Sequence, residues 1–287
     1  MIDLHAHILP GVDDGAHDIQ DSLEMAVMAA DSGVSIMVAT PHSNQTGRFE
    51  NFCSEKLSGD FRRLKAAIRQ NHIPLRILEG MEIFASEDLE DKIKKGLLTG
   101  INHTDYYLVE FPFEADPMWI GECLDAVFEA GKIPLIAHPE RYFCVQDFPE
   151  IVYEWLRSGC YAQMNKGSIL GRFGGRVRES ARILLENDLI TCVASDAHRS
   201  YVRTPHMKEV RDHLTRNGGF EYTYHLLEGN PRRIISNRQI PAHGRRPERL
   251  RRYYWREGEQ GECYEKIKNT KHYRICGSSG LLWNVQK

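Results

Sequence analysis

Two histidines lie near the start of the chain, two residues apart in the apolar segment Met1-Ile-Asp-Leu-His-Ala-His7. Because side chains alternate across a β-strand, His5 and His7 should project from the same face, opposite Ile2, Leu4 and Ala6. Two imidazoles placed in this way can bind one metal ion. Taken alone the pair is weak evidence, since two polar residues at a strand end explain it about equally well.

Further residues of metal-binding type stand at or near the ends of later apolar segments. They are His42, Glu82, Glu110, His138, Asp196 and His198. Each lies where a strand should pass into a loop, and the carboxyl ends of parallel strands meet at one face of a barrel or wound sheet. Convergence on one site is therefore a better explanation than coincidence.

Imidazoles mixed with carboxylates are ligands that suit Mn²⁺, Fe or Zn²⁺. Divalent ions about 3.5 to 4 Å apart lower the pKa of a bridging water from about 15.7 towards neutrality, which generates hydroxide for attack on phosphorus. Arg141 and Arg203 follow His138 and His198 by three and five residues. Their guanidinium groups can bind phosphate oxygens from the adjoining loops. Surface salt bridges are the alternative reading of both arginines.

Strand and helix patterns alternate about seven times between residues 1 and 236. After the first strand we expect strands at 34–40, 74–82, 106–111, 133–137, 160–164 and 189–194. Helices are expected from Asp18 or Asp21 to Gly33, then at 55–72, 86–96, 118–131, 147–158, 174–187 and about 206–228. Strands that alternate with helices, separated by short segments containing Gly and Pro, predict a parallel sheet whose strands are joined by right-handed crossovers. This pattern favours an irregular (β/α) barrel, with an open doubly wound sheet as the alternative.

Composition narrows the class of protein. With 287 residues and 41% hydrophobic content, one α/β domain accounts for most of the chain. No apolar segment approaches the roughly 20 residues of a membrane span, and no signal peptide precedes the first strand. Seven scattered cysteines without a C-x-x-C pair favour reduced thiols, so we expect a cytoplasmic protein.

The charge is distributed unevenly along the chain. Residues 241–287 hold 11 Lys and Arg against 5 Asp and Glu, whereas residues 1–240 have a net charge of −9. An acidic main domain argues against a broad nucleic-acid-binding surface. The pattern predicts one domain at 1–240 and a basic extension at 241–287, which we expect to be disordered or loosely packed.

Several short motifs together resemble a known superfamily. They are Val12-Asp-Asp-Gly15, Thr40-Pro-His42, Gly80-Met-Glu82, Ile136-Ala-His-Pro-Glu-Arg-Tyr142, Ala194-Ser-Asp-Ala-His198 and Asn230-Pro-Arg-Arg-Ile-Ile235, in addition to the first two histidines. In this order they resemble the polymerase-and-histidinol-phosphatase (PHP) superfamily. More narrowly, they resemble its manganese-dependent protein-tyrosine phosphatases of the CpsB/YwqE type, which act in capsule and exopolysaccharide synthesis.

The resemblance implies a distorted (β/α)7 TIM-like barrel, the PHP fold, with two or three divalent ions. The first ion would be bound by His5, His7, Glu82 and Asp196; the second by Glu82, Glu110 and His138; the third by Asp14, His42 and His198. The D-D-G motif favours Asp14 over Asp13 as the ligand. Arg141 and Arg203 would bind the substrate phosphate, with Asp196 and His198 also part of the catalytic set.

The resulting hypothesis is a Mn²⁺-dependent protein-tyrosine phosphatase, with Fe, Zn²⁺ or Mg²⁺ as alternative ions. It would oppose an autophosphorylating bacterial tyrosine kinase. None of the seven cysteines is followed by arginine six residues later, so the C-x5-R thiolate mechanism is excluded. The alternatives are a histidinol-phosphate type phosphatase, a phosphodiesterase, and a binding module that has lost turnover. The sequence leaves the oligomeric state open, a homo-oligomer included.

Overall fold

The computed structural model describes residues 1–242 and residue 244. The prediction of a disordered basic extension at 241–287 therefore falls almost entirely outside the described residues. No helix in the described part of the chain is long and apolar enough to cross a membrane.

The strands form two parallel sheets. They are β1 (Ile2–Ala6), β2 (Ile36–Ala39), β3 (His42–Ser43), β4 (Arg76–Glu79), β5 (Glu82–Phe84), β6 (Tyr106–Glu110), β7 (Ile133–Ala137), β8 (Tyr161–Asn165) and β9 (Cys192–Ala194). The first sheet has the order β1-β2-β4 and the second β3-β5-β6-β7-β8-β9, and every neighbouring pair is parallel. The predicted α/β class with parallel strands is confirmed.

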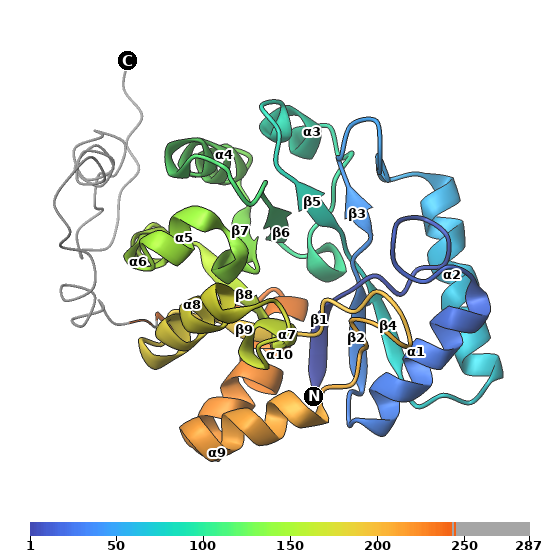
Figure 1. Ribbon diagram of the computed structural model, residues 1–287. Helices are drawn as coiled ribbons and strands as arrows, with labels where there is room; N and C mark the ends of the chain where they lie inside the picture. The colour runs from blue at the N-terminus through green and yellow to red at the C-terminus, as the bar shows by residue number, and fades with distance from the viewer. Residues whose placement is uncertain (243, 245–287) are drawn as a thin grey trace, which may run out of the picture.

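Helices surround the strands (Figure 1). They are α1 (Ile19–Asp31), α2 (Glu55–Gln70), α3 (Leu89–Lys94), α4 (Pro117–Glu129), α5 (Phe143–Asp147), α6 (Glu150–Arg157), α7 (Lys166–Ile169), α8 (Gly175–Glu186), α9 (Lys208–Tyr224) and α10 (Asn230–Ile235). Short 3₁₀ turns occupy Ile101–His103 and Pro139–Arg141, and a π-helical turn, His225–Gly229, joins α9 to α10.

Local sequence explains where the long helices begin. Asp18 caps α1 by accepting a hydrogen bond from the backbone N–H of Asp21, so the first of the two predicted caps is confirmed. Ser54 caps α2 in the same way. The helix predicted at 147–158 is α6, Glu150–Arg157, which begins three residues later than expected because α5 ends at Asp147 and Pro149, which lacks an N–H group, precedes α6.

Two strands of the expected pattern are interrupted. The break between β2 and β3 falls at Pro41, and that between β4 and β5 at Gly80. A Cβ atom at Gly80 would lie 2.9 Å from the side chain of Val38, so only glycine permits this close approach. Beyond the breaks, β3 pairs with β5 in a register that sets His42 beside Glu82.

The strands have apolar residues on both faces. One buried cluster includes Ile2 and Leu4, and a second, larger one packs against the helices and includes Ala6. The prediction that these three residues share one face is therefore wrong. The register of β1 against β2 shifts between Asp3 and Ala6, which breaks the alternation within the strand.

Backbone hydrogen bonds join β1 to the segment that follows β9. The N–H of Asp196 donates to the carbonyl of His5 at 2.9 Å, and the N–H of His7 donates to the carbonyl of Ala197 at 2.8 Å. Within the described residues, the first strand and the last therefore lie side by side. This contact places the two N-terminal histidines next to the segment that carries Asp196.

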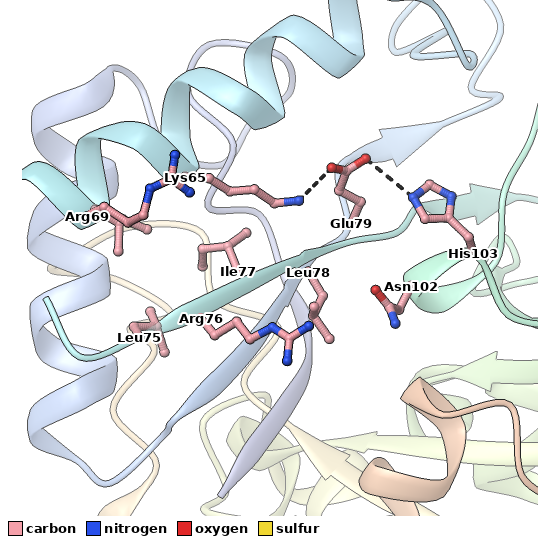
Figure 2. A pocket seen from close by; sticks show the side chains of 10 residues that line it. Lys65, Arg69, Leu75, Arg76, Ile77, Leu78, Glu79, Asn102 and His103 are labelled. Atoms are coloured by element: carbon pink, nitrogen blue, oxygen red, sulfur yellow. Dashed lines mark hydrogen bonds and ion pairs between the residues drawn. The ribbon is translucent and has the colours of Figure 1, made fainter.

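A polar cavity of about 450 Å³ lies between α2, β4 and the 101–103 turn (Figure 2). Its carboxylate, Glu79, is 2.6 Å from Nζ of Lys65 and 3.5 Å from Nε2 of His103. Because Lys65 already pairs with this carboxylate, which is the only acidic group that lines the cavity, the cavity lacks the free acidic oxygens that a cation needs. A metal centre must be sought elsewhere among the described residues.

Candidate metal centre

All the side chains predicted as metal ligands lie in one region, at the carboxyl ends of the strands. Three groups have potential ligand atoms within 4.8 Å of one another: His5, His7 and Asp196; His42, Glu82 and Glu110; and His7, Asp14, His42 and His198. The ninth residue, His138, has Nε2 at 3.0 Å from Glu82 Oε1 and 3.6 Å from Glu110 Oε1. These sets overlap the three predicted ones, with His7 and His42 each shared between two groups.

The first two histidines direct their Nε2 atoms at each other, 3.2 Å apart. Nδ1 of His5 lies 2.9 Å from Oε1 of Gln163, and Nδ1 of His7 lies 2.8 Å from a carboxylate oxygen of Asp13. Both oxygens only accept, so each Nδ1 carries the hydrogen. Burial lowers the pKa of both imidazoles, but the charges of Glu82 near His5 and Asp13 near His7 raise it overall, so a shared cation at the two Nε2 atoms would take the place of bound protons.

Glu82 lies at the middle of the cluster and is 1% exposed. Its oxygens lie 3.2 Å from Nε2 of His5, 3.1 Å from Nε2 of His7 and 3.0 Å from Nδ1 of His42. One of these oxygens, Oε2, has no hydrogen-bond partner with suitable geometry. A buried carboxylate surrounded by imidazole nitrogens is well suited to bridge two ions.

The two aspartates of the D-D-G motif have different surroundings. Both carboxylate oxygens of Asp13 already have hydrogen-bond partners. They accept from the backbone N–H groups of His42 and Gly15, and one of them also contacts His7. Asp14 Oδ1 lies 3.5 Å from Nε2 of both His42 and His198 and has no hydrogen-bond partner. The geometry favours Asp14 as a ligand and Asp13 as the group that orients His7.

Gly15 holds this loop against the first strand. A Cβ atom at this position would lie 2.1 Å from the backbone oxygen of His7, and the next residue, Ala16, donates to that same oxygen at 2.8 Å. Only glycine allows the chain to pass so closely. The third residue of the motif therefore brings both aspartates to the histidines.

Asp196 contacts groups from several parts of the chain. Its Oδ1 lies 3.6 Å from Nε2 of His5, and its Oδ2 accepts from Nδ2 of Asn165 and from Arg203. Burial by itself raises the pKa of Asp196, but the Arg203 guanidinium and His5 hold that pKa well below its usual range. The carboxylate is therefore ionised and available to a cation at neutral pH.

Backbone strain is concentrated at this site. His138, Asp196 and Arg203 have φ angles of 34°, 50° and 48°, in the left-handed region that non-glycine residues rarely adopt. Each such residue costs on the order of 1–3 kcal/mol and persists only where surrounding contacts hold it. All three strained residues direct their side chains towards the metal-ligand cluster.

The two predicted phosphate-binding arginines lie beside the cluster. Nη1 of Arg203 is 3.1 Å from Nε2 of His198, and Nη1 of Arg141 is 3.7 Å from Oδ2 of Asp196. The Arg141 guanidinium also lies over the rings of Phe113 and Phe173, at 4.4 and 4.8 Å from the ring centroids. Both arginines line a cavity of about 300 Å³ together with Asp14, His42, Glu110 and His138.

Burial in the absence of a cation disfavours the charged forms of Glu110 and His138. Burial and the charge of Glu82 raise the pKa of Glu110 to about 8. Burial lowers the pKa of His138 to about 4, so its imidazole is neutral at physiological pH. Buried carboxylate oxygens without hydrogen-bond partners, converging imidazole nitrogens and a mixed N/O donor set all fit divalent cations.

Comparison with known proteins places the chain in a family. The family described as capsular polysaccharide synthesis, CpsB/CapC, matches residues 1–236. The chain belongs to the CpsB/CapC family. Tyrosine-protein phosphatase YwqE of Bacillus subtilis is 35% identical over 254 residues, which cover 88% of this chain and 99% of YwqE. Tyrosine-protein phosphatase CpsB of Streptococcus agalactiae is 33% identical over 245 residues, 84% of this chain and all of CpsB.

A solved structure agrees with this assignment. It comes from crystal structures of YwqE from Bacillus subtilis and CpsB from Streptococcus pneumoniae, described as unique metal-dependent tyrosine phosphatases. The match has a TM-score of 0.78 at 35% identity and covers 86% of this chain and 98% of the solved chain. The resemblance inferred from the short motifs is confirmed at the level of the family.

Some residues of this CpsB/CapC site were missed or misjudged from sequence. Gln163, which fixes His5, lies two residues before Asn165 on β8, and strand alternation could have placed both on one face. The side chain of Asn165 is buried and contacts Asp196. No spacing signal indicated Phe173. Phe111 and Phe113 line the cavity, and Trp119 packs edge-on against Phe111.

Glu140 positions the loop that carries Arg141. It is fully buried, and its Oε1 accepts from the backbone N–H of Asn165 at 3.0 Å and from the Ser168 hydroxyl at 2.6 Å. The other oxygen, Oε2, is buried without a partner. Burial raises the pKa of Glu140 from 4.5 to about 7.

This pKa predicts a pH-dependent contribution to stability. Between pH 4.5 and 7 the unfolded chain ionises Glu140 while the folded chain keeps it protonated, so its contribution is full below that window and lost as pH rises through it. Relative to Glu140→Gln, wild-type protein in chelator should lose up to about 3 kcal/mol of unfolding free energy between pH 4.5 and 7. Urea unfolding of both proteins across this range measures the difference. Parallel pH curves would contradict the prediction.

Proposed function

We propose that the chain is a metal-dependent protein-tyrosine phosphatase. The observation that carries the proposal is the convergence of imidazole nitrogens and of carboxylate oxygens without hydrogen-bond partners beside two arginines. The CpsB/CapC relatives named as tyrosine-protein phosphatases support the same reaction. A histidinol-phosphate phosphatase or a phosphodiesterase is not favoured by these relatives.

We propose three ion positions in this cluster. We assign His5, His7, Glu82 and Asp196 to one ion; Glu82, Glu110 and His138 to a second; and Asp14, His42 and His198 to a third. Mn²⁺ is the proposed ion, because mixed imidazole and carboxylate donors without thiolates suit it, and Fe, Zn²⁺ and Mg²⁺ are the alternatives to be tested. When bound, such ions would supply positive charge for the phosphoryl oxygens and a water of lowered pKa.

The side chains around the cavity then bind and orient the substrate. Arg141 and Arg203 present planar guanidinium groups to phosphate oxygens, and Asp196 holds the first of them by charge and the second by a hydrogen bond. The ring of Phe113 lines the same cavity and can stack on a phenyl group. Phenolate has a pKa near 10, so tyrosine leaves more readily than an alcohol side chain would.

The pairing of the strands supports a distorted (β/α)7 barrel. If β2 with β3 and β4 with β5 each count as one interrupted strand, the two sheets join into a single sheet with β1 and β9 at its edges. The hydrogen bonds between β1 and the segment after β9 would close that sheet into a ring. Such a barrel presents every predicted ligand at its carboxyl-terminal mouth.

The physiological role is proposed from the family. CpsB/CapC proteins are associated with capsular polysaccharide synthesis, and an autophosphorylating bacterial tyrosine kinase would be the natural phosphotyrosine substrate. A cytoplasmic location and a homo-oligomer stay predictions. A substrate panel tests the central proposal: with added Mn²⁺, a phosphotyrosyl peptide should be hydrolysed in preference to histidinol phosphate. The reverse preference would overturn the proposed substrate.

Arg141→Lys should mainly weaken substrate capture. A lysine retains the positive charge but loses the planar fork and the stacking on Phe113 and Phe173. We expect KM for a phosphotyrosyl peptide to rise by about tenfold or more, with a smaller change in kcat. Steady-state kinetics with bound metal measured in parallel checks this. An unchanged KM would remove Arg141 from phosphate binding.

A further inference from the structure

A second cavity of about 500 Å³ adjoins the candidate site. The two cavities share Phe113 and Arg141 as lining residues. Beyond them the second cavity is bounded by α5 and by the first turn of α8, which contact each other (Figure 1). A substrate that placed its phosphate in the first cavity would therefore extend past Arg141 towards the second.

Arg141 forms a fixed partition between the two cavities. Its guanidinium lies between the rings of Phe113 and Phe173, and Gln146 donates to its backbone oxygen at 3.0 Å. An arginine held on both faces keeps its position when substrate is absent. The same residue can therefore contact the phosphate on one side and a neighbouring part of the substrate on the other.

The lining of the second cavity is largely apolar. Phe143, the first residue of α5, is 53% exposed, whereas most large apolar side chains of the described chain are buried. The backbone N–H of Phe143 donates to the carbonyl of Phe113 at 2.8 Å, and this hydrogen bond fixes the backbone that carries the Phe143 ring. Phe173 and Val177 complete the apolar surface, and Arg176 beside them is already paired with Asp147.

We propose that this cavity is a substrate-specificity subsite that binds an aromatic side chain one or two residues from the phosphotyrosine. The proposal rests on the proposed function. Rings at Phe143 and Phe173 offer faces and edges for another ring, and the Arg141 guanidinium, stacked on Phe173, bounds the cavity on the side of the first cavity. An aromatic side chain would cover the exposed Phe143 and gain affinity through burial. The subsite thus selects among phosphotyrosine sites by their neighbours.

A set of phosphotyrosyl peptides tests the proposal. Four of them carry a single Phe, at one of the two positions before or the two positions after the phosphotyrosine, and a fifth carries Gly at all four positions. With Mn²⁺ added, wild-type protein should prefer Phe at one position by about tenfold in kcat/KM. Phe143→Ala should lose this preference while turnover of p-nitrophenyl phosphate, which has no flanking residues, stays within about twofold. Phe220→Ala is the matched control, because Phe220 is 78% exposed on α9 and lines neither cavity.

A second variant fills the cavity instead of enlarging it. A Cβ atom at Gly175 meets no atom within 4 Å, so Gly175→Leu fits the first turn of α8 and narrows the space. It should reduce kcat/KM for the preferred Phe peptide and spare the all-Gly peptide. Equal turnover of all peptides by wild-type protein, or a Phe preference that survives both variants, would overturn the subsite. Failure to hydrolyse any phosphotyrosyl substrate would instead overturn the proposed function.

Discussion

Asp196→Asn should nearly abolish phosphatase activity and reduce the bound metal. The substitution keeps the size of the side chain but removes the charge that faces His5, His7 and His198. Removing a residue that only hydrogen-bonds to a metal ligand typically lowers metal affinity or activity by about 10–100-fold. Removing a ligand itself should therefore lower kcat/KM by more than about 100-fold. Turnover of a phosphotyrosyl peptide and metal content per chain measure the two effects.

A matched control separates loss of the site from loss of an ion pair. Asp105→Asn also breaks a salt bridge, to Lys132 at 2.7 Å, but Asp105 lies outside the cluster. It should retain wild-type metal content and turnover. Wild-type metal content in Asp196→Asn would contradict the assignment of Asp196 as a ligand.

Glu82→Gln should have an even larger effect on metal content. Glu82 contacts four imidazoles and is the carboxylate assigned to two ions, whereas Asp196 is assigned to one. A neutral amide cannot bridge two cations, and its N–H₂ group would face imidazole nitrogens. We expect two ions to be lost per chain and turnover to fall at least as far as in Asp196→Asn.

The control for this variant is Glu79→Gln, a conservative change at the end of β4 in the cavity of Figure 2. It breaks the contacts with Lys65 and His103 and should leave metal binding intact. Metal content is read by elemental analysis after dialysis. A Glu82→Gln protein that binds as many ions as wild type would show that Glu82 does not bridge them.

Much of the fold and of the cluster could be predicted because the signals are local or periodic. Strand alternation put His5 and His7 together, and the ends of parallel strands gave His138 and Asp196 a common edge. The α/β alternation predicted parallel strands without any knowledge of their order. These inferences need only the regular geometry of strands and helices, which most of the described residues adopt.

The rest depended on contacts between distant segments. The need for glycine at residue 80 follows from the nearby side chain of Val38, and the shift within β1 is a feature of its pairing with β2. The placement of Phe173 against Arg141 arises from the packing of α8, which no spacing indicates. Such features depend on tertiary structure and are visible only when the segments are brought together.

Removal and return of the metal tests the central claim most directly. Protein stripped with a chelator and dialysed should hydrolyse no phosphotyrosyl peptide, and titration with Mn²⁺ should restore turnover in step with occupancy of the ion positions. Undiminished turnover by protein in which elemental analysis detects no divalent ion would contradict the account.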